Sequence, residues 1–218
     1  LCLSSIFIAS LVSCNLIFQK FFEIDIWIPF LGIYTFQQSV GLLPYPITFI
    51  VTDIISELYG KQKANQVVTV GLLASLFMLL IVTVSDKMPS APFGVGSEVF
   101  SQVFGLSSAA VFASMMAYLI AQYIDVRVFH FWKRLTNGKH LWLRNNASTV
   151  FSQFIDTFLV VCLLSIFGAL QWKLFWGLVL SGFLFKIIVA VLDTPLLYFF
   201  VGIFRKTFAL KATDELEI

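Results

Sequence analysis

Long apolar segments follow one another along almost the whole chain, and they limit what it can fold into. Residues 65–85 contain no charged residue, and neither do residues 1–19 or 107–124. A helix needs about 20 mostly apolar residues to cross a membrane. Only 12% of the residues are charged, against about 25% in a typical soluble domain. The sequence therefore predicts an all-α, polytopic membrane protein.

The apolar segments divide into six predicted spans, which form a single transmembrane domain. We expect these spans at about residues 1–19, 46–58, 65–85, 107–124, 145–168 and 174–203. Proline and glycine residues interrupt residues 27–45, before the second span, and there we predict an irregular or re-entrant stretch. Irregular backbone at membrane depth survives only inside protein or beside a cavity. This stretch is therefore a candidate cavity wall.

Basic residues are concentrated on one side of the predicted bundle. Ten of the 14 Lys and Arg residues fall in the loops after the second and fourth spans or in the tail: Lys61, Lys63, Arg127, Lys133, Arg134, Lys139, Arg144, Arg205, Lys206 and Lys211. Cytoplasmic loops carry such an excess, so six spans place both termini in the cytoplasm. The first segment lacks the basic region that begins a signal peptide, and we expect it to be retained as a helix.

Several ionisable residues lie inside the spans, where charge is costly and is usually functional. Asp53 and Glu57 are four residues apart and so share one face of a helix. Lys186 and Asp193 also share a face, about two helical turns apart. Two further acids each follow a carboxamide by three residues, in the pairs Gln122–Asp125 and Gln153–Asp156. We expect these groups to face a cavity.

The fifth predicted span carries the richest polar stripe, in which Asn145, Ser148, Ser152 and Asp156 follow helical spacing. Such groups cannot face lipid without a large desolvation cost. A purely structural alternative stays open, in which Asp156 or Asp193 pairs with Lys186 or Arg144 and only joins helices. Arg144, just before the stripe, belongs either to the site or to the cytoplasmic lipid headgroup region.

The interior groups favour a particular kind of ligand. Carboxylates and carboxamides exchange paired hydrogen bonds, and aromatic rings stack on planar molecules. Together they suit a polar, planar, purine-like small molecule with a guanine-like edge. The net charge of +2 is too small to indicate nucleic acid, and three Cys with two His predict neither a cofactor nor a metal site. No catalytic motif is present, so we do not expect an enzyme.

Three motifs resemble those of the queuosine precursor transporter family. The first runs from Pro46-Ile-Thr-Phe through Asp53 and Glu57 to Tyr59-Gly60, and the second from Arg144-Asn145-Asn146 to Gln153 and Asp156. Ala121-Gln122 with Asp125 is similar to a third element. The resemblance covers about residues 27–203. It implies import of 7-deazaguanine bases (preQ0, preQ1 or queuine) through a bacterial inner membrane, for salvage into the tRNA nucleoside queuosine.

The resemblance also implies a set of substrate-binding residues. They are Asp53, Glu57, Gln122, Asp125, Arg144, Asn145, Ser148, Gln153, Asp156, Lys186 and Asp193. Asp156 would pair with the guanine-like edge, Gln153 and Asn145 would read neighbouring groups, and Lys186 would be a counter-ion for Asp193.

Two alternatives to this function stay open. The family looks related to the substrate-binding subunits of energy-coupling-factor transporters, so the chain could serve another vitamin together with a separate ATPase partner. Ser5, Ala9 and Ser13 have the small-residue spacing by which those subunits dock a partner, although ordinary helix packing also accounts for it. The partner is either an energy-coupling protein or a second copy of this chain. The second alternative is a membrane scaffold whose polar groups only join helices.

Overall fold

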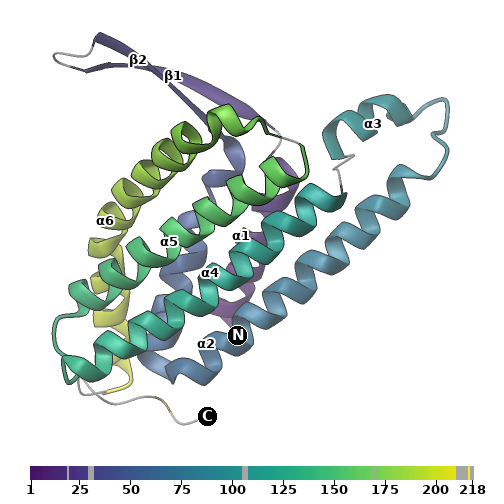
Figure 1. Ribbon diagram of the computed structural model, residues 1–218. Coiled ribbons are helices and arrows are strands. Elements are labelled where there is room, and N and C mark those ends of the chain that lie inside the picture. Colours follow the sequence, from purple (N-terminus) through teal and green to yellow (C-terminus); the bar gives the residue numbers. More distant parts are fainter. Residues whose placement is uncertain (19, 29–31, 105–107, 169, 210–215, 217–218) are drawn as a thin grey trace.

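Long helices packed side by side form the body of the protein (Figure 1). The computed structural model describes residues 1–18, 20–28, 32–104, 108–168, 170–209 and 216; Gln19, Pro29, Ser107 and Lys211, which the predictions above include, lie outside them. Within the described residues there are six α-helices: α1 (Cys2–Ile17), α2 (Tyr45–Asp86), α3 (Ser97–Phe104), α4 (Ser108–Leu135), α5 (Leu141–Ile166) and α6 (Phe175–Thr207). Short 3-10 helices, η1 (Val40–Leu42) and η2 (Trp172–Leu174), precede α2 and α6.

The predicted class, an all-α membrane protein, is confirmed. Three helical stretches of the described residues are long and apolar enough to cross a membrane, namely Val40–Asp86, Leu141–Ile166 and Trp172–Thr207, and Cys2–Ile17 is a shorter apolar helix. The second half of α2 is apolar all round, since Val68 is buried while Leu73 and Phe77 are exposed. A helix that is hydrophobic on every face suits a lipid environment.

Helix α2 consists of two arms that meet at a sharp kink at Gly60. The first arm (residues 45–59) and the second arm (residues 61–86) correspond to the predicted spans at 46–58 and 65–85, and they run in opposite directions (Figure 1). Phe7 of α1 packs in one core cluster with Ile55 of the first arm and Val68 of the second. The apolar α1 therefore holds the two arms in place.

The kink depends on glycine. Gly60 has φ 78° and ψ 176°, a backbone region that essentially only glycine adopts. We expect Gly60→Ala to lower the free energy of unfolding by roughly 1–3 kcal/mol, because the added Cβ strains this corner. Thermal unfolding in detergent measures the loss. Gly177→Ala is the matched control, since a Cβ there meets nothing within 4 Å; equal unfolding temperatures for the two variants would contradict the requirement for glycine.

A β-hairpin replaces most of the irregular stretch expected at 27–45. Strands β1 (Phe21–Ile28) and β2 (Gly32–Ser39) pair antiparallel, with Phe21 opposite Ser39 and Ile28 opposite Gly32. The sequence carries the signal for β1, because polar and apolar residues alternate through Glu23, Ile24 and Asp25, as strands require. The hairpin projects beyond the helices (Figure 1). Most of the predicted cavity wall therefore lies outside the bundle.

The bundle has two distinct ends. The hairpin end carries β1, β2 and α3, while the loop end carries the Gly60 kink and the connection between α4 and α5 (Figure 1). The start of α1 and the last turn of α6 lie toward the loop end (Figure 1). Helices α4 and α5 extend toward this end beyond their predicted bounds, to Leu135 and back to Leu141. Of the basic residues predicted to share one side, those in the described part of the chain therefore come together there.

Candidate functional site

Buried and half-buried polar side chains occupy three successive layers between α2, α4, α5 and α6. From the hairpin end to the loop end these are the cleft layer (Tyr45, Gln153, Asp156, Lys186), the carboxyl pair (Asp53, Asp125) and the ion cluster (Glu57, Lys133, Arg144, Arg205). Since a helix rises about 1.5 Å per residue, Asp53 lies about 12 Å along α2 from Tyr45, and Glu57 about 6 Å further. The layers thus form a polar axis through an apolar bundle.

The ion cluster joins four helices at the loop end. Glu57 Oε1 accepts a hydrogen bond from Arg144 Nη2 at 2.6 Å and another from Arg205. Lys133 Nζ lies 3.8 Å from Glu57 Oε2 and donates to the Glu57 carbonyl oxygen at 3.2 Å. Glu57 and Arg144 are 1% and 2% exposed. The Glu57 carboxylate therefore bridges three cations, one from each of the other three helices.

This arrangement decides the position of two predicted site residues. Arg144 does not face lipid headgroups, because its guanidinium is buried against Glu57 and also donates to the carbonyls of Gly138 and Lys139 at 2.9 and 3.1 Å. Glu57 and Arg144 thus bind one another, far from the cleft layer. Sequence reasoning missed Arg205 because 148 positions separate it from Glu57.

The carboxyl pair lies in the middle of the bundle. The side chains of Asp53 and Asp125 lie within hydrogen-bonding reach of each other. Ser152 Oγ donates to Asp125 Oδ1 at 2.9 Å, and Ser148 lies close enough to do the same. Asp53 Oδ1 and Asp125 Oδ2 have no hydrogen-bond donor among the described residues. The structure therefore places Asp53, Asp125 and Ser148 together, one layer below the cleft.

Two further predicted residues have protein partners of their own. Gln122 Nε2 donates to the Tyr118 hydroxyl at 2.7 Å, and its Oε1 accepts from Thr52 Oγ1 at 3.3 Å. Asn145 Nδ2 lies 3.5 Å from Thr194 Oγ1 on α6. Neither residue lines the cleft. Their hydrogen bonds connect α4 with α2 and α5 with α6.

A narrow cleft opens between the first arm of α2, α5 and α6. About 300 Å³ of space lies between its walls, open solvent at its mouth included, but its narrowness leaves room for little more than a water molecule. Its walls include the aromatic rings of Tyr45, Phe49 and Phe185 and the polar side chains of Gln153, Lys186 and Asp193. Leu42 and Tyr45, at the end of the predicted 27–45 stretch, do line this cavity. Three predicted site residues, Gln153, Lys186 and Asp193, thus line one cleft.

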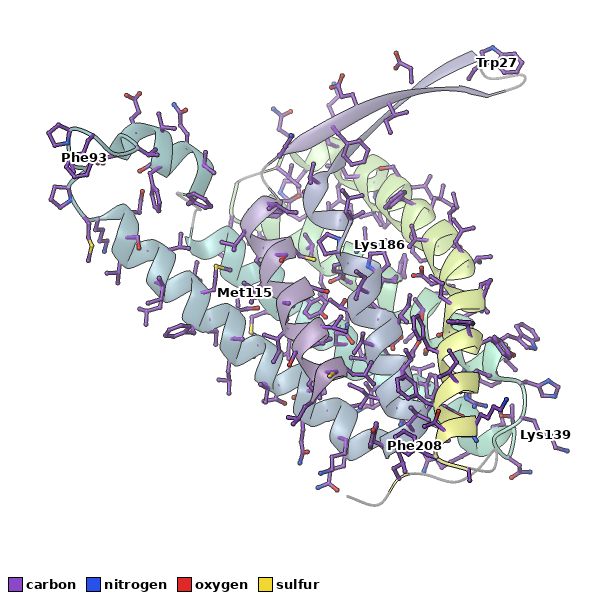
Figure 2. All side chains as sticks on the ribbon, turned by 180° about the vertical axis from the view of Figure 1, so that it is seen from behind. Trp27, Phe93, Met115, Lys139, Lys186 and Phe208 are labelled. Atoms are coloured by element: carbon purple, nitrogen blue, oxygen red, sulfur yellow. The ribbon has the colours of Figure 1, made fainter. Side chains whose placement is uncertain are left out.

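Asp156 lies directly behind this lining, where two donors hold one of its oxygens. The Tyr45 hydroxyl donates to Asp156 Oδ2 at 2.5 Å, and the Lys186 ammonium pairs with the same oxygen. Lys186 also lies 4.8 Å from the centre of the Tyr45 ring, in the bundle interior (Figure 2). The predicted Lys186–Asp193 pair is therefore corrected to Lys186–Asp156, since the lysine side chain reaches across to α5.

Two buried acceptors in this layer lack donors. Asp156 Oδ1 and Gln153 Oε1 have no hydrogen-bond partner among the described residues, although both side chains are only 3% exposed. Buried polar atoms are normally satisfied, so each exception needs an explanation. Both atoms only accept hydrogen bonds, and a ligand that fits them must supply N–H or O–H groups. Within the described part of the chain, no group of three or more His, Cys, Asp or Glu side chains is placed to hold a metal ion.

Comparison with known proteins identifies the family. A family model described as "Putative vitamin uptake transporter" matches residues 39–200. The chain belongs to this family. The matched region contains all three polar layers except Arg205, and it contains every predicted site residue. The chain is therefore a multi-pass membrane transporter for a small molecule.

Three curated relatives have more specific names. A "Probable queuosine precursor transporter" of Bacillus subtilis (strain 168) is 28% identical over 73% of this chain and 70% of its own length. The "Queuosine precursor transporter" of Escherichia coli (strain K12) is 29% identical over 56% of this chain and 52% of its own length. A "Probable queuosine precursor transporter" of Haemophilus influenzae (strain ATCC 51907 / DSM 11121 / KW20 / Rd) is 28% identical, with 72% and 65% covered. No solved structure matches the chain.

These comparisons confirm the resemblance to queuosine precursor transporters that the sequence motifs indicated. The relatives are named transporters rather than enzymes. The polar axis belongs, accordingly, to a transport protein.

Proposed function

We propose that this transporter imports queuosine precursors, the 7-deazaguanine bases preQ0, preQ1 or queuine, and that the cleft layer binds them. The names of the three relatives support the substrate class. The observation that carries the proposal is the pair of buried acceptors without donors, Asp156 Oδ1 and Gln153 Oε1, beside an aromatic-walled cleft.

The chemistry of the base matches these groups. A guanine-like edge presents a ring N–H beside an exocyclic amine, and a carboxylate can accept both in a paired, charge-assisted arrangement. Asp156 would accept this edge, and Gln153, one turn earlier on α5, would accept or donate at the neighbouring group. Tyr45 and Phe49, whose ring centres are 5.3 Å apart, offer faces on which a planar base stacks.

Binding a base requires that the cleft layer rearrange. The cleft is too narrow for a bicyclic ring while Lys186 and Tyr45 hold Asp156. The arriving base would displace these two donors from the carboxylate. Lys186 would then turn toward Asp193, which lines the same cleft. In this scheme Lys186 neutralises Asp156 only while the site has no ligand.

The charge distribution supports an orientation in the bacterial inner membrane. Basic residues gather at the loop end, and such residues favour the cytoplasmic side. The loop end and both termini would then lie in the cytoplasm, with the hairpin end outside. The cleft layer, nearest the hairpin end, would be the first polar layer that an incoming base meets.

The proposal is tested in a bacterial strain that neither makes queuosine precursors nor has its own importer. Expression of this chain is expected to restore queuosine in tRNA when preQ0, preQ1 or queuine is supplied at low concentration. Titration of the purified protein with each base identifies the preferred one. Absence of both restored queuosine and binding, with the protein present in the membrane, would overturn the proposal.

A further inference from the structure

The carboxyl pair has an internal requirement that the cleft layer does not share. A carboxylate can only accept hydrogen bonds, so two carboxyl groups bond to each other only when one of them carries a proton. Asp53 and Asp125 lie within such reach, at 1% and 0% exposure. Each keeps one buried oxygen without a donor among the described residues. If one carboxyl carries a proton, its O–H donates to the other carboxyl, and the contact between Asp53 and Asp125 needs no other hydrogen-bond donor.

The charges around the pair are few and mostly committed elsewhere. Asp53 experiences the charges of Asp125 from α4, Glu57 from its own helix and Arg144 from α5. Arg144 is hydrogen-bonded to Glu57, which it shares with Lys133 and Arg205.

The neighbouring helices α1 and α6 add little charge near the pair. Helix α1 contains no Asp, Glu, Lys or Arg. On α6, Lys186 pairs with Asp156, and Asp193 lines the cleft. Among the described residues, the neutral hydroxyls of Ser152 and Ser148 also lie against Asp125, beside its contact with Asp53.

The position of the pair links it to both neighbouring layers. Ser152, which donates to Asp125, lies on α5 one helical turn from Asp156. Asp53 lies on α2 one turn from Glu57. When the pair loses its proton, the two charges repel across the α2–α4 contact. Loss of the shared proton would therefore move α5 beside the cleft, through Ser152, and α2 beside the ion cluster, through Glu57.

We propose that Asp53 and Asp125 share one proton and that import is driven by a proton gradient through this pair. The inference rests on the proposed function. One proton binds from the hairpin side as the O–H of one carboxyl and leaves on the loop side as a hydrated proton. No bond in the transported base changes. Deprotonation separates α2 from α4 and opens the loop end, and reprotonation restores the contact.

Proteoliposomes containing the full chain test the coupling with radiolabelled preQ0, whose nitrile group is uncharged. With acid outside, the base is expected to accumulate up to about tenfold per unit of pH difference, the limit for one proton per base. A protonophore should abolish this accumulation. Asp125→Asn and Asp53→Asn should still bind preQ0 but neither exchange nor accumulate it, because the amide N–H replaces the shared proton permanently and the loop end stays closed. Glu98→Gln, an exposed position on α3, is the control and should behave as wild type.

A second readout requires no ligand. Infrared spectra of the purified protein at neutral pH should contain the carbonyl band of a protonated carboxylic acid that each Asp→Asn variant removes and Glu98→Gln retains. An unchanged band in both Asp variants would overturn the shared proton.

The transport measurement separates the coupling from the proposed function. Exchange in wild type without an effect of the gradient would overturn the coupling alone and would favour an ATPase partner or passive uptake. Absence of exchange in wild type would overturn the proposed function, and the coupling with it.

Discussion

Replacing Glu57 by glutamine is expected to lower the free energy of unfolding by about 3–5 kcal/mol, the range for breaking a buried ion pair from one side. Glutamine keeps the shape of the side chain but removes the only carboxylate that Arg144, Arg205 and Lys133 share in the described structure. The three cations then lie close together without the carboxylate charge that they shared. Titration from a mild detergent into SDS measures the change.

The loss of stability in Glu57→Gln can be compared with that in two other variants. Arg205→Gln leaves Glu57 with two cations, so its cost should be well below that of Glu57→Gln. Glu98→Gln, which removes an exposed carboxylate, should cost almost nothing. If Glu57→Gln were no more harmful than Arg205→Gln, Glu57 would not be the centre of the cluster.

Asp156→Asn is expected to weaken binding of the preferred base about ten- to hundredfold, since a hydrogen bond to a charged group contributes about 1.5–3 kcal/mol. The asparagine oxygen can still accept from Tyr45, but the side chain no longer offers two charged acceptors to a guanine-like edge. Calorimetric titration of the purified variant measures the loss, and the unfolding temperature shows whether the variant is folded.

Lys186→Met should have the opposite effect on binding. The lysine competes with the base for Asp156 in the scheme above, so its removal should tighten binding of an uncharged base such as preQ0. Weaker binding would mean that Lys186 contacts the base itself. Wild-type affinity in a folded Asp156→Asn variant would show that Asp156 is not the acceptor.

The helical body was predictable because each apolar segment carries its own signal. Residues 65–85 are uncharged and long enough to span, so no tertiary information is needed to recognise the second arm of α2. The hairpin was missed although Glu23, Ile24 and Asp25 alternate as in a strand. The prolines and glycines of residues 27–45 suggest a broken helix instead, and the apolar composition of the chain favours membrane-spanning helices over strands.

The sequence indicated which polar residues share a helix face, but not which side chains pair across helices. Helical spacing correctly grouped Gln153 with Asp156 and Lys186 with Asp193 on shared faces. Which acid meets which base depends on the rotation of one helix against another, and no single-helix pattern contains it. Lys186 therefore pairs with Asp156, and Arg144 with Glu57. Asp53 and Asp125 come into contact only because α4 packs against α2.

The corner at Gly60 has a practical consequence for mapping this protein's orientation. The two arms of α2 meet without an intervening loop, so an epitope inserted there would break a helix and displace α1. Residues 87–96, in contrast, are exposed throughout and precede α3. Exposed loop tips tolerate insertion and proteolytic cleavage best. A tag or protease site between residues 90 and 96 should therefore report which side of the membrane the hairpin end faces in living cells.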